Sequence, residues 1–141
     1  MNKMLIGYTT GVYDLFHIGH LNLLRKARSM CDKLVVGVTA DKLVSYKHKK
    51  PVIPFVERIE IVQACMYVDL AIPQDSLDKI EARKKIKYDL LFVGDDWYQN
   101  PKWEEYDLTL NKMGVKIIYL PYTKNTSSTL INDTLEKIRN E

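Results

Sequence analysis

The stretch that decides the fold is Gly11-Val12-Tyr13-Asp14-Leu15-Phe16-His17-Ile18-Gly19-His20. An apolar run, residues 4–9, precedes it, and a run of good helix formers begins at Leu21. The stretch is therefore predicted to be a turn that leads from a buried strand into a helix. Such a turn presents unpaired N–H groups and the positive end of a helix dipole. Because Gly11 lets a ligand approach the backbone closely, the pattern predicts an anion site here.

The composition is that of an ordinary soluble domain. Its 141 residues are enough for one domain with a sizeable core, so we expect a single domain over residues 1–141. The net charge of +3 is too small to indicate general nucleic-acid binding. Cys31 and Cys65 have no metal-ligand spacing and fit a reduced, cytoplasmic protein. With no secretory signal and no apolar run of membrane-spanning length, we expect no membrane insertion.

Short apolar runs alternate with helical patterns over the whole chain. Runs of this kind are typical of strands that are covered on both faces. We therefore expect a Rossmann-like, doubly wound α/β fold, in which a five-stranded parallel sheet carries helices on both faces. The predicted strands are residues 4–9, 33–39, 68–72, 89–94 and 115–120. The helical patterns cover residues 20–27, 55–66, 76–87, 103–113 and 128–139.

Polar segments follow four of the predicted strands. In open parallel sheets, ligands bind outside the carboxyl ends of the strands. Four segments should therefore meet at one edge of the sheet and form the ligand site. They are residues 11–20, 39–50, 94–100 and 121–128.

Two histidines, His17 and His20, lie in the first of these segments. One interpretation is a pair held by hydrogen bonds at the start of the helix. A zinc pair is less favoured, because its usual helical spacing is four and a glutamate normally lies between the ligands. Neither of the glycine-rich phosphate motifs, G-x-G-x-x-G and G-x-x-x-x-G-K-[ST], is present. We favour imidazoles that donate hydrogen bonds to phosphate oxygens.

Four motifs, in order, resemble those of the cytidylyltransferase-like nucleotidyltransferases. They are the decapeptide that ends in His17-Ile18-Gly19-His20, Lys47-His48-Lys49-Lys50 with the following Arg58, Gly94-Asp95-Asp96-Trp97, and residues 123–129. The tetrapeptide also matches class I aminoacyl-tRNA synthetases. That interpretation is rejected because no K-M-S-K-S loop follows and the length leaves no room for a tRNA-binding domain.

The resemblance implies transfer of CMP from CTP to a small phosphorylated alcohol, with release of pyrophosphate. The greatest similarity is to the members that act on sn-glycerol 3-phosphate and form CDP-glycerol, a precursor of cell-envelope polymers. Mg²⁺ on the triphosphate and a homodimer are implied as well, with no metal site made by the protein alone. Alternatives are ethanolamine phosphate, choline phosphate or another polyol phosphate as the acceptor, ATP in place of CTP, or a non-catalytic nucleotide-binding subunit.

Family motifs also imply the residues of the site. Asp14 would orient the turn or the metal, with a helix cap as the alternative, and Arg58 would contact phosphate or lie at the surface. The implied catalytic residues are His17, His20, Lys47 and Lys49. The implied nucleotide- or substrate-binding residues are Thr10, Gly11, Val12, Tyr13, Asp14, Gly19, Asp41, Arg58, Gly94, Asp95, Asp96, Trp97, Tyr122, Thr123, Lys124, Ser127, Ser128 and Thr129.

At several positions the chain departs from the family pattern. Tyr122 and Met66 stand where the family has arginines, and neither can copy the flat guanidinium fork that binds phosphate. Lys124 stands where the family has an acidic residue. Either Lys124 restores the lost positive charge, or the acceptor pocket has changed.

Overall fold

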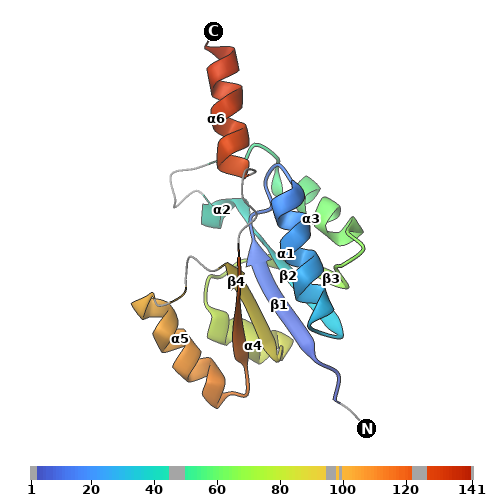
Figure 1. Ribbon diagram of the computed structural model, residues 1–141, viewed down its shortest axis with the longest axis vertical. Helices are drawn as coiled ribbons and strands as arrows, with labels where there is room; N and C mark the ends of the chain where they lie inside the picture. Colours follow the sequence, from blue (N-terminus) through green and yellow to red (C-terminus); the bar gives the residue numbers. More distant parts are fainter. Residues whose placement is uncertain (1–2, 45–49, 95–97, 99, 122–126, 141) are drawn as a thin grey trace.

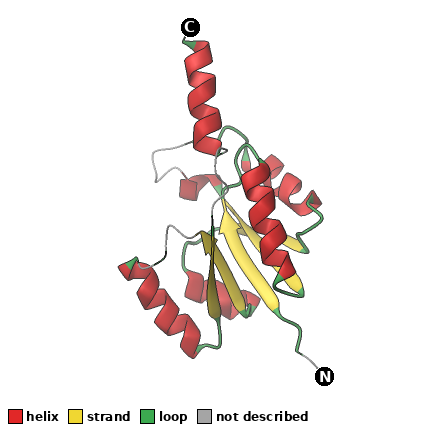
Figure 2. Cartoon of the chain, in the orientation of Figure 1, coloured by secondary structure: helices red, strands yellow, loops and turns green. Residues whose placement is uncertain are grey.

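Five parallel strands form the centre of the molecule (Figures 1 and 2). The computed structural model describes residues 3–44, 50–94, 98, 100–121 and 127–140. The strands are β1 (Ile6–Gly11), β2 (Lys33–Thr39), β3 (Leu70–Gln74), β4 (Leu90–Gly94) and β5 (Lys116–Leu120). Their order in the sheet is β3-β2-β1-β4-β5, and every neighbouring pair is parallel.

Helices cover both faces of the sheet (Figure 1). On one face α1 and α3 supply Leu24 and Val62 to a core that includes Val36 of β2. On the other face α4 and α5 pack over Tyr8 and Leu91. The doubly wound α/β prediction is therefore confirmed. The helices are α1 (Ile18–Ser29), α2 (Asp41–Val44), α3 (Phe55–Ala64), α4 (Lys79–Ile86), α5 (Pro101–Lys112) and α6 (Ser128–Arg139).

The strand order makes β1 the switch point of the sheet. The chain adds β2 and β3 on one side of β1 and then returns to add β4 and β5 on the other side. In this topology the connections after β1 and β4 leave in opposite directions and open a crevice at the carboxyl ends of the strands. The β1–α1 turn, which contains the two histidines, lies at this crevice.

Carboxylate groups accept backbone hydrogen bonds at the amino ends of the central strands. Asp89 Oδ2 accepts the N–H of Ile6 at 3.0 Å, and Asp69 Oδ2 accepts the N–H of Leu34 at 2.7 Å. These contacts satisfy backbone donors that the sheet leaves unpaired. Polar groups at this end of the sheet are thus used for the fold.

One predicted helix differs from the structure. The pattern over residues 55–66 placed Met66 on the buried face, but α3 ends at Ala64 and Cys65 is extended. Met66 is 85% exposed, whereas Val68, two residues later, is buried. The chain leaves the helix early because Val68 must reach the core before β3 begins.

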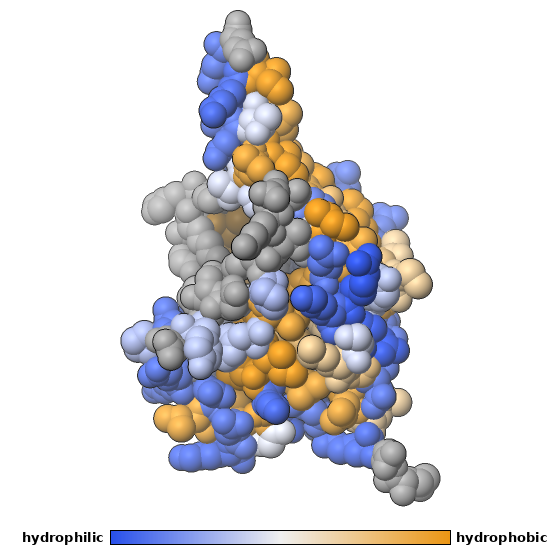
Figure 3. All heavy atoms as spheres, viewed as in Figure 1, coloured by the Kyte–Doolittle hydropathy of each residue, from blue (hydrophilic) through white to orange (hydrophobic). Residues whose placement is uncertain are grey.

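The last helix extends away from the rest of the molecule (Figure 1). None of the α6 residues is buried. Apolar side chains line one side of the helix and polar side chains the other (Figure 3). Across the described ranges, no helix is long and apolar enough to cross a membrane.

We expect Gly7→Ala to destabilise the fold without changing its topology. A Cβ at this position would lie 2.6 Å from Cε2 of Phe92 and 2.8 Å from Sγ of Cys31. Overpacking a close-packed core costs about 1–3 kcal/mol. Urea unfolding followed by circular dichroism measures the change. In the double variant Gly7→Ala/Phe92→Leu, leucine leaves room for the added methyl group. The loss of unfolding free energy should therefore be smaller than the sum of the losses in the two single variants. Equal stability of Gly7→Ala and the parent would contradict this packing.

Candidate active site

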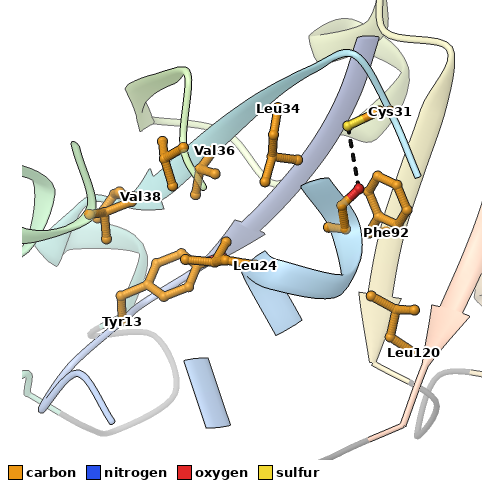
Figure 4. Packing of buried hydrophobic residues seen from close by; sticks show 11 residues of the cluster. Tyr13, Leu24, Cys31, Leu34, Val36, Val38, Phe92 and Leu120 are labelled. Carbon is orange, nitrogen blue, oxygen red and sulfur yellow. Dashed lines mark hydrogen bonds between the residues drawn. The ribbon is translucent and has the colours of Figure 1, made fainter. Parts of the chain in front are cut away.

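Two left-handed residues shape the turn between β1 and α1. Tyr13 has φ 55° and Leu15 has φ 51°, values that residues with a side chain rarely adopt. Burial of the Tyr13 ring beside Leu24 holds this conformation (Figure 4). A Cβ on Gly11 would lie 2.9 Å from that ring. In this structure, therefore, the glycine makes room for Tyr13, a different reason from the ligand approach that the sequence suggested.

The two histidines form a capping box at the start of α1. His17 is the N-cap, and its Nδ1 accepts the N–H of Gly19 at 3.0 Å. His20 reaches back, so that its Nδ1 accepts the N–H of His17 at 3.1 Å. The imidazole rings stack with their centroids 3.9 Å apart. The interpretation as a hydrogen-bonded helix-start pair is therefore confirmed.

This cap also determines the tautomer of both rings. A neutral imidazole has one protonated nitrogen, and Nδ1 is the acceptor in each histidine. The proton is consequently on Nε2 of both His17 and His20. Each ring keeps one N–H donor that the cap does not use. Helix capping and phosphate binding are thus compatible functions of the same pair.

Burial keeps both rings neutral. It lowers the pKa of His17, and it lowers the pKa of His20 to about 4, with His17 adding to the effect and Asp14 opposing it. A second proton on either ring would have to occupy Nδ1, which is an acceptor in the cap. At pH 7 the pair therefore provides two neutral donors at the N-terminus of a helix.

Asp14 connects the turn to two other segments. Its carboxylate accepts the N–H of Val52 at 2.8 Å and that of Ile53 at 2.9 Å. Its carbonyl accepts the hydroxyl of Ser128, the first residue of α6, at 2.6 Å. The expectation that Asp14 orients the turn agrees with this geometry, but the alternative of a helix cap is wrong, because His17 is the cap. Each carboxylate oxygen of Asp14 thus has one backbone partner.

Arg58 does not lie at the surface, contrary to one of the two sequence interpretations. Its side chain is fully buried and forms an ion pair with Asp41, with Nη2 and Oδ1 2.6 Å apart. Its other hydrogen bonds go to backbone carbonyls, among them Val12 at the end of β1. The structure thus links three predicted site residues, Val12, Asp41 and Arg58, in one contact network.

Lys79 is a candidate that the sequence did not bring to attention. It is the first residue of α4 and is buried, and its Nζ donates to Oγ1 of Thr10 at 2.7 Å. Thr10 lies near the carboxyl end of β1, so the lysine adds positive charge to the edge that holds the histidines. The signal available in the sequence was its position a few residues after β3, in a segment whose helical pattern was weak.

Some of the remaining predicted residues lie in described helices and strands, and the others lie outside the described residues. Ser127 is the N-cap of α6 and accepts the N–H of Leu130, whereas Thr129 is exposed. Gly19 is in the first turn of α1 and Gly94 is the last residue of β4. Eight predicted residues lie outside the described residues: Lys47, Lys49, Asp95, Asp96, Trp97, Tyr122, Thr123 and Lys124.

The structure is a doubly wound α/β domain with a histidine turn at its switch point, and comparison with known proteins identifies its family. The family model described as cytidylyltransferase-like matches residues 8–133. The chain therefore belongs to the cytidylyltransferase-like nucleotidyltransferases, a family of enzymes.

Relatives within the family have different substrates in their names. The chain is 36% identical to a glycerol-3-phosphate cytidylyltransferase of Staphylococcus aureus, over 90% of this chain and 92% of that protein. It is 31% identical to an FAD synthase of Archaeoglobus fulgidus, over 91% and 96% of the two chains. Among solved structures, a lipopolysaccharide core biosynthesis protein of Thermoplasma volcanium is similar, with a TM-score of 0.72 and 26% identity. The match covers 88% of this chain and all of that one.

We expect His20 to make stability dependent on pH in a defined window. Its pKa is about 4 in the fold and 6.5 ordinarily, so below pH 6.5 the unfolded chain binds the proton first. This contribution to stability is complete above pH 6.5 and is lost as the pH falls toward about 4. Urea unfolding between pH 7 and pH 4.5 measures the dependence.

His20→Gln is the matched control, because glutamine at this position can keep the capping box but does not titrate. The variant should lose less stability than the parent over the same window. Nitrogen NMR of the imidazoles should show a proton on Nε2 of both histidines at pH 7. A normal pKa for His20, or a proton on its Nδ1, would contradict the cap as described.

Proposed function

We propose that the protein transfers CMP from CTP to sn-glycerol 3-phosphate, giving CDP-glycerol and pyrophosphate. The observation that supports this choice of substrates most strongly is the similarity to the Staphylococcus glycerol-3-phosphate cytidylyltransferase, which extends over nearly the full length of both chains. The family provides the type of reaction, and this relative provides the acceptor.

The site fits a reaction that needs charge stabilisation more than proton transfer. The phosphate of the acceptor attacks the α-phosphorus of CTP, and the bond to the leaving pyrophosphate breaks. Because the phosphate is already an anion at neutral pH, no general base is required. His17 and His20 supply neutral Nε2 donors beside the N-terminus of α1, where negative charge is stabilised. Positioning and electrostatic stabilisation are the main sources of catalysis in such transfers.

Positive charge comes to the site from lysines. We propose that Lys47 and Lys49 pair with the triphosphate, as the family motif implies. Lys79, which contacts Thr10 at the end of β1, is placed to attract an anionic substrate at the same edge. Mg²⁺ would be held by the triphosphate and would neutralise part of its charge. We also propose a cytoplasmic homodimer, in which size-exclusion chromatography would show twice the 16.4 kDa mass.

A second candidate acts on other substrates by the same chemistry. The similarity to FAD synthases is nearly as high as that to the glycerol-3-phosphate enzyme. FAD consists of AMP joined to FMN through a pyrophosphate link, so ATP and FMN would replace CTP and glycerol 3-phosphate. Tyr122 and Lys124, which depart from the family pattern, leave room for a changed acceptor.

A matrix of substrates tests these proposals. CTP and ATP should each be combined with glycerol 3-phosphate, ethanolamine phosphate, choline phosphate and FMN in the presence of Mg²⁺. We expect pyrophosphate release with CTP and glycerol 3-phosphate, and a product with the mass of CDP-glycerol. Reaction of ATP with FMN, and none of CTP with any alcohol phosphate, would establish the second candidate instead.

Two substitutions separate catalysis from helix capping. Asparagine at position 17 can cap the helix through Oδ1, and glutamine at position 20 can complete the capping box. Neither reproduces the imidazole donor, so we expect His17→Asn and His20→Gln to lower kcat about 10²–10³-fold. Far-ultraviolet circular dichroism should remain unchanged. Turnover near that of the parent would limit the histidine concerned to its role in the cap.

A further inference from the structure

Arg58 is buried completely, although it belongs to a helix with a solvent-exposed outer side. Its Nε donates to the carbonyl of Ile53 at 2.9 Å. Its Nη1 donates to the carbonyls of Val12 at 2.6 Å and Thr39 at 2.9 Å. Its Nη2 donates to Oδ1 of Asp41 at 2.6 Å. Four acceptors from four places in the sequence therefore surround one guanidinium group.

All four acceptors lie at the carboxyl edge of the sheet. Val12 directly follows β1, Thr39 is the last residue of β2, Asp41 begins α2, and Ile53 is two residues before α3. A buried guanidinium is costly unless its charge and its donors are satisfied. An apolar side chain could fill the same volume, so packing alone does not explain an arginine here. What an apolar side chain could not do is hold together the three segments that supply these acceptors, after β1, after β2 and before α3.

The segments that Arg58 connects include parts of the candidate active site. Val12 is in the turn that leads to His17 and His20. Asp41 and Ile53 flank, on either side, the stretch of sequence that contains Lys47 and Lys49. Asp14 adds a second connection, because its carboxylate binds the N–H groups of Val52 and Ile53.

We propose that Arg58 is a positioning residue for nucleotidyl transfer. Its hydrogen bonds set the histidine turn in register with both flanks of the lysine stretch. The effect on turnover that we expect from this inference rests on the proposed function. The positioning role replaces the phosphate contact that the sequence suggested for this residue, since the guanidinium is enclosed by Val12, Thr39, Ile53 and Asp41.

Lysine should not substitute for this arginine. The ammonium group is a single point, whereas the guanidinium fork directs N–H groups toward separate acceptors in one plane. Arg58→Lys therefore keeps the charge and loses the geometry. If only charge mattered, this variant would behave like the parent.

The experiment compares Arg58→Ala with Val62→Ala. Both residues are fully buried and lie one turn apart on α3, but Val62 packs in the apolar core and has no side-chain donor for the contacts that Arg58 makes. Both variants should be less stable in urea. We expect kcat to fall about 10²-fold in Arg58→Ala and no more than about threefold in Val62→Ala, since small misplacements of reacting groups are costly. The KM for CTP should change less than kcat in Arg58→Ala.

Chemical rescue gives a readout that a simple loss of stability would not produce. Guanidinium ion at low millimolar concentration should enter the space vacated in Arg58→Ala and raise its kcat at least about tenfold, because it restores the same donors. Ammonium at equal ionic strength should not, and neither salt should help Val62→Ala. If guanidinium has no effect and the loss of kcat follows stability equally in both variants, the proposal is overturned.

A third measurement does not depend on any reaction. In the substrate-free protein, hydrogen exchange at the amides of Val52 and Ile53 should be faster in Arg58→Lys than in the parent. Unchanged exchange would overturn the positioning role, and this variant also serves if Arg58→Ala does not fold. If the parent shows no CMP transfer but exchange responds as expected, the proposed function fails while the structural connection stands.

Discussion

The hydrogen bonds between the two histidines and the backbone at the start of α1 are the interaction on which the candidate site depends. His17 and His20 each use Nδ1 to satisfy an N–H group that a helix leaves unpaired. The same bonds leave the proton on Nε2, and burial keeps the rings uncharged. The same hydrogen bonds therefore start the helix and leave two Nε2–H donors. A tautomer with the proton on Nδ1 could not form this cap.

A steric constraint places that cap where the sheet can use it. The turn passes through two left-handed residues, Tyr13 and Leu15, each of which costs about 1 kcal/mol or more. The fully packed Tyr13 ring opposes this cost, and Gly11 leaves the space that the ring occupies. Packing of the core on one side of the sheet thus offsets the backbone strain in the turn. The polar part of the turn lies at the edge of the sheet.

The arrangement of the sheet could be predicted because it depends on local patterns. Apolar runs such as Leu34–Val38 are too continuous for a half-exposed strand, and alternation with helices implies parallel pairing. The end of α3 could not be found in this way, because the burial of Val68 determines it and Met66 fits the helical period equally well. The histidine turn was recognisable from its residues, whereas the direction of each Nδ1 depends on the folded backbone.

Arg58 was predicted as a site residue from its motif, but its burial and its contacts were beyond prediction. An arginine on an amphipathic helix lies at the surface by default. Its burial here depends on carbonyl groups that are 46 and 19 residues away in the sequence, at Val12 and Thr39. Lys79 is a similar case, since Thr10, its partner, is 69 residues away. Contacts of this range exist only once the sheet has brought the strand ends together.

The same network constrains where the charge for nucleotide binding can come from. Two neutral imidazoles donate hydrogen bonds but do not offset the charge of a triphosphate, and the charge of Arg58 is paired with Asp41. Under the proposed function, bound Mg²⁺ and the lysines would provide the compensation. Lysine suits this task because it is a mobile point charge, whereas the fork of arginine suits a fixed position between several acceptors. The chain thus has arginine in the buried framework of the site and lysines in the cluster that follows β2 in sequence, an allocation that follows from the chemistry of the two side chains.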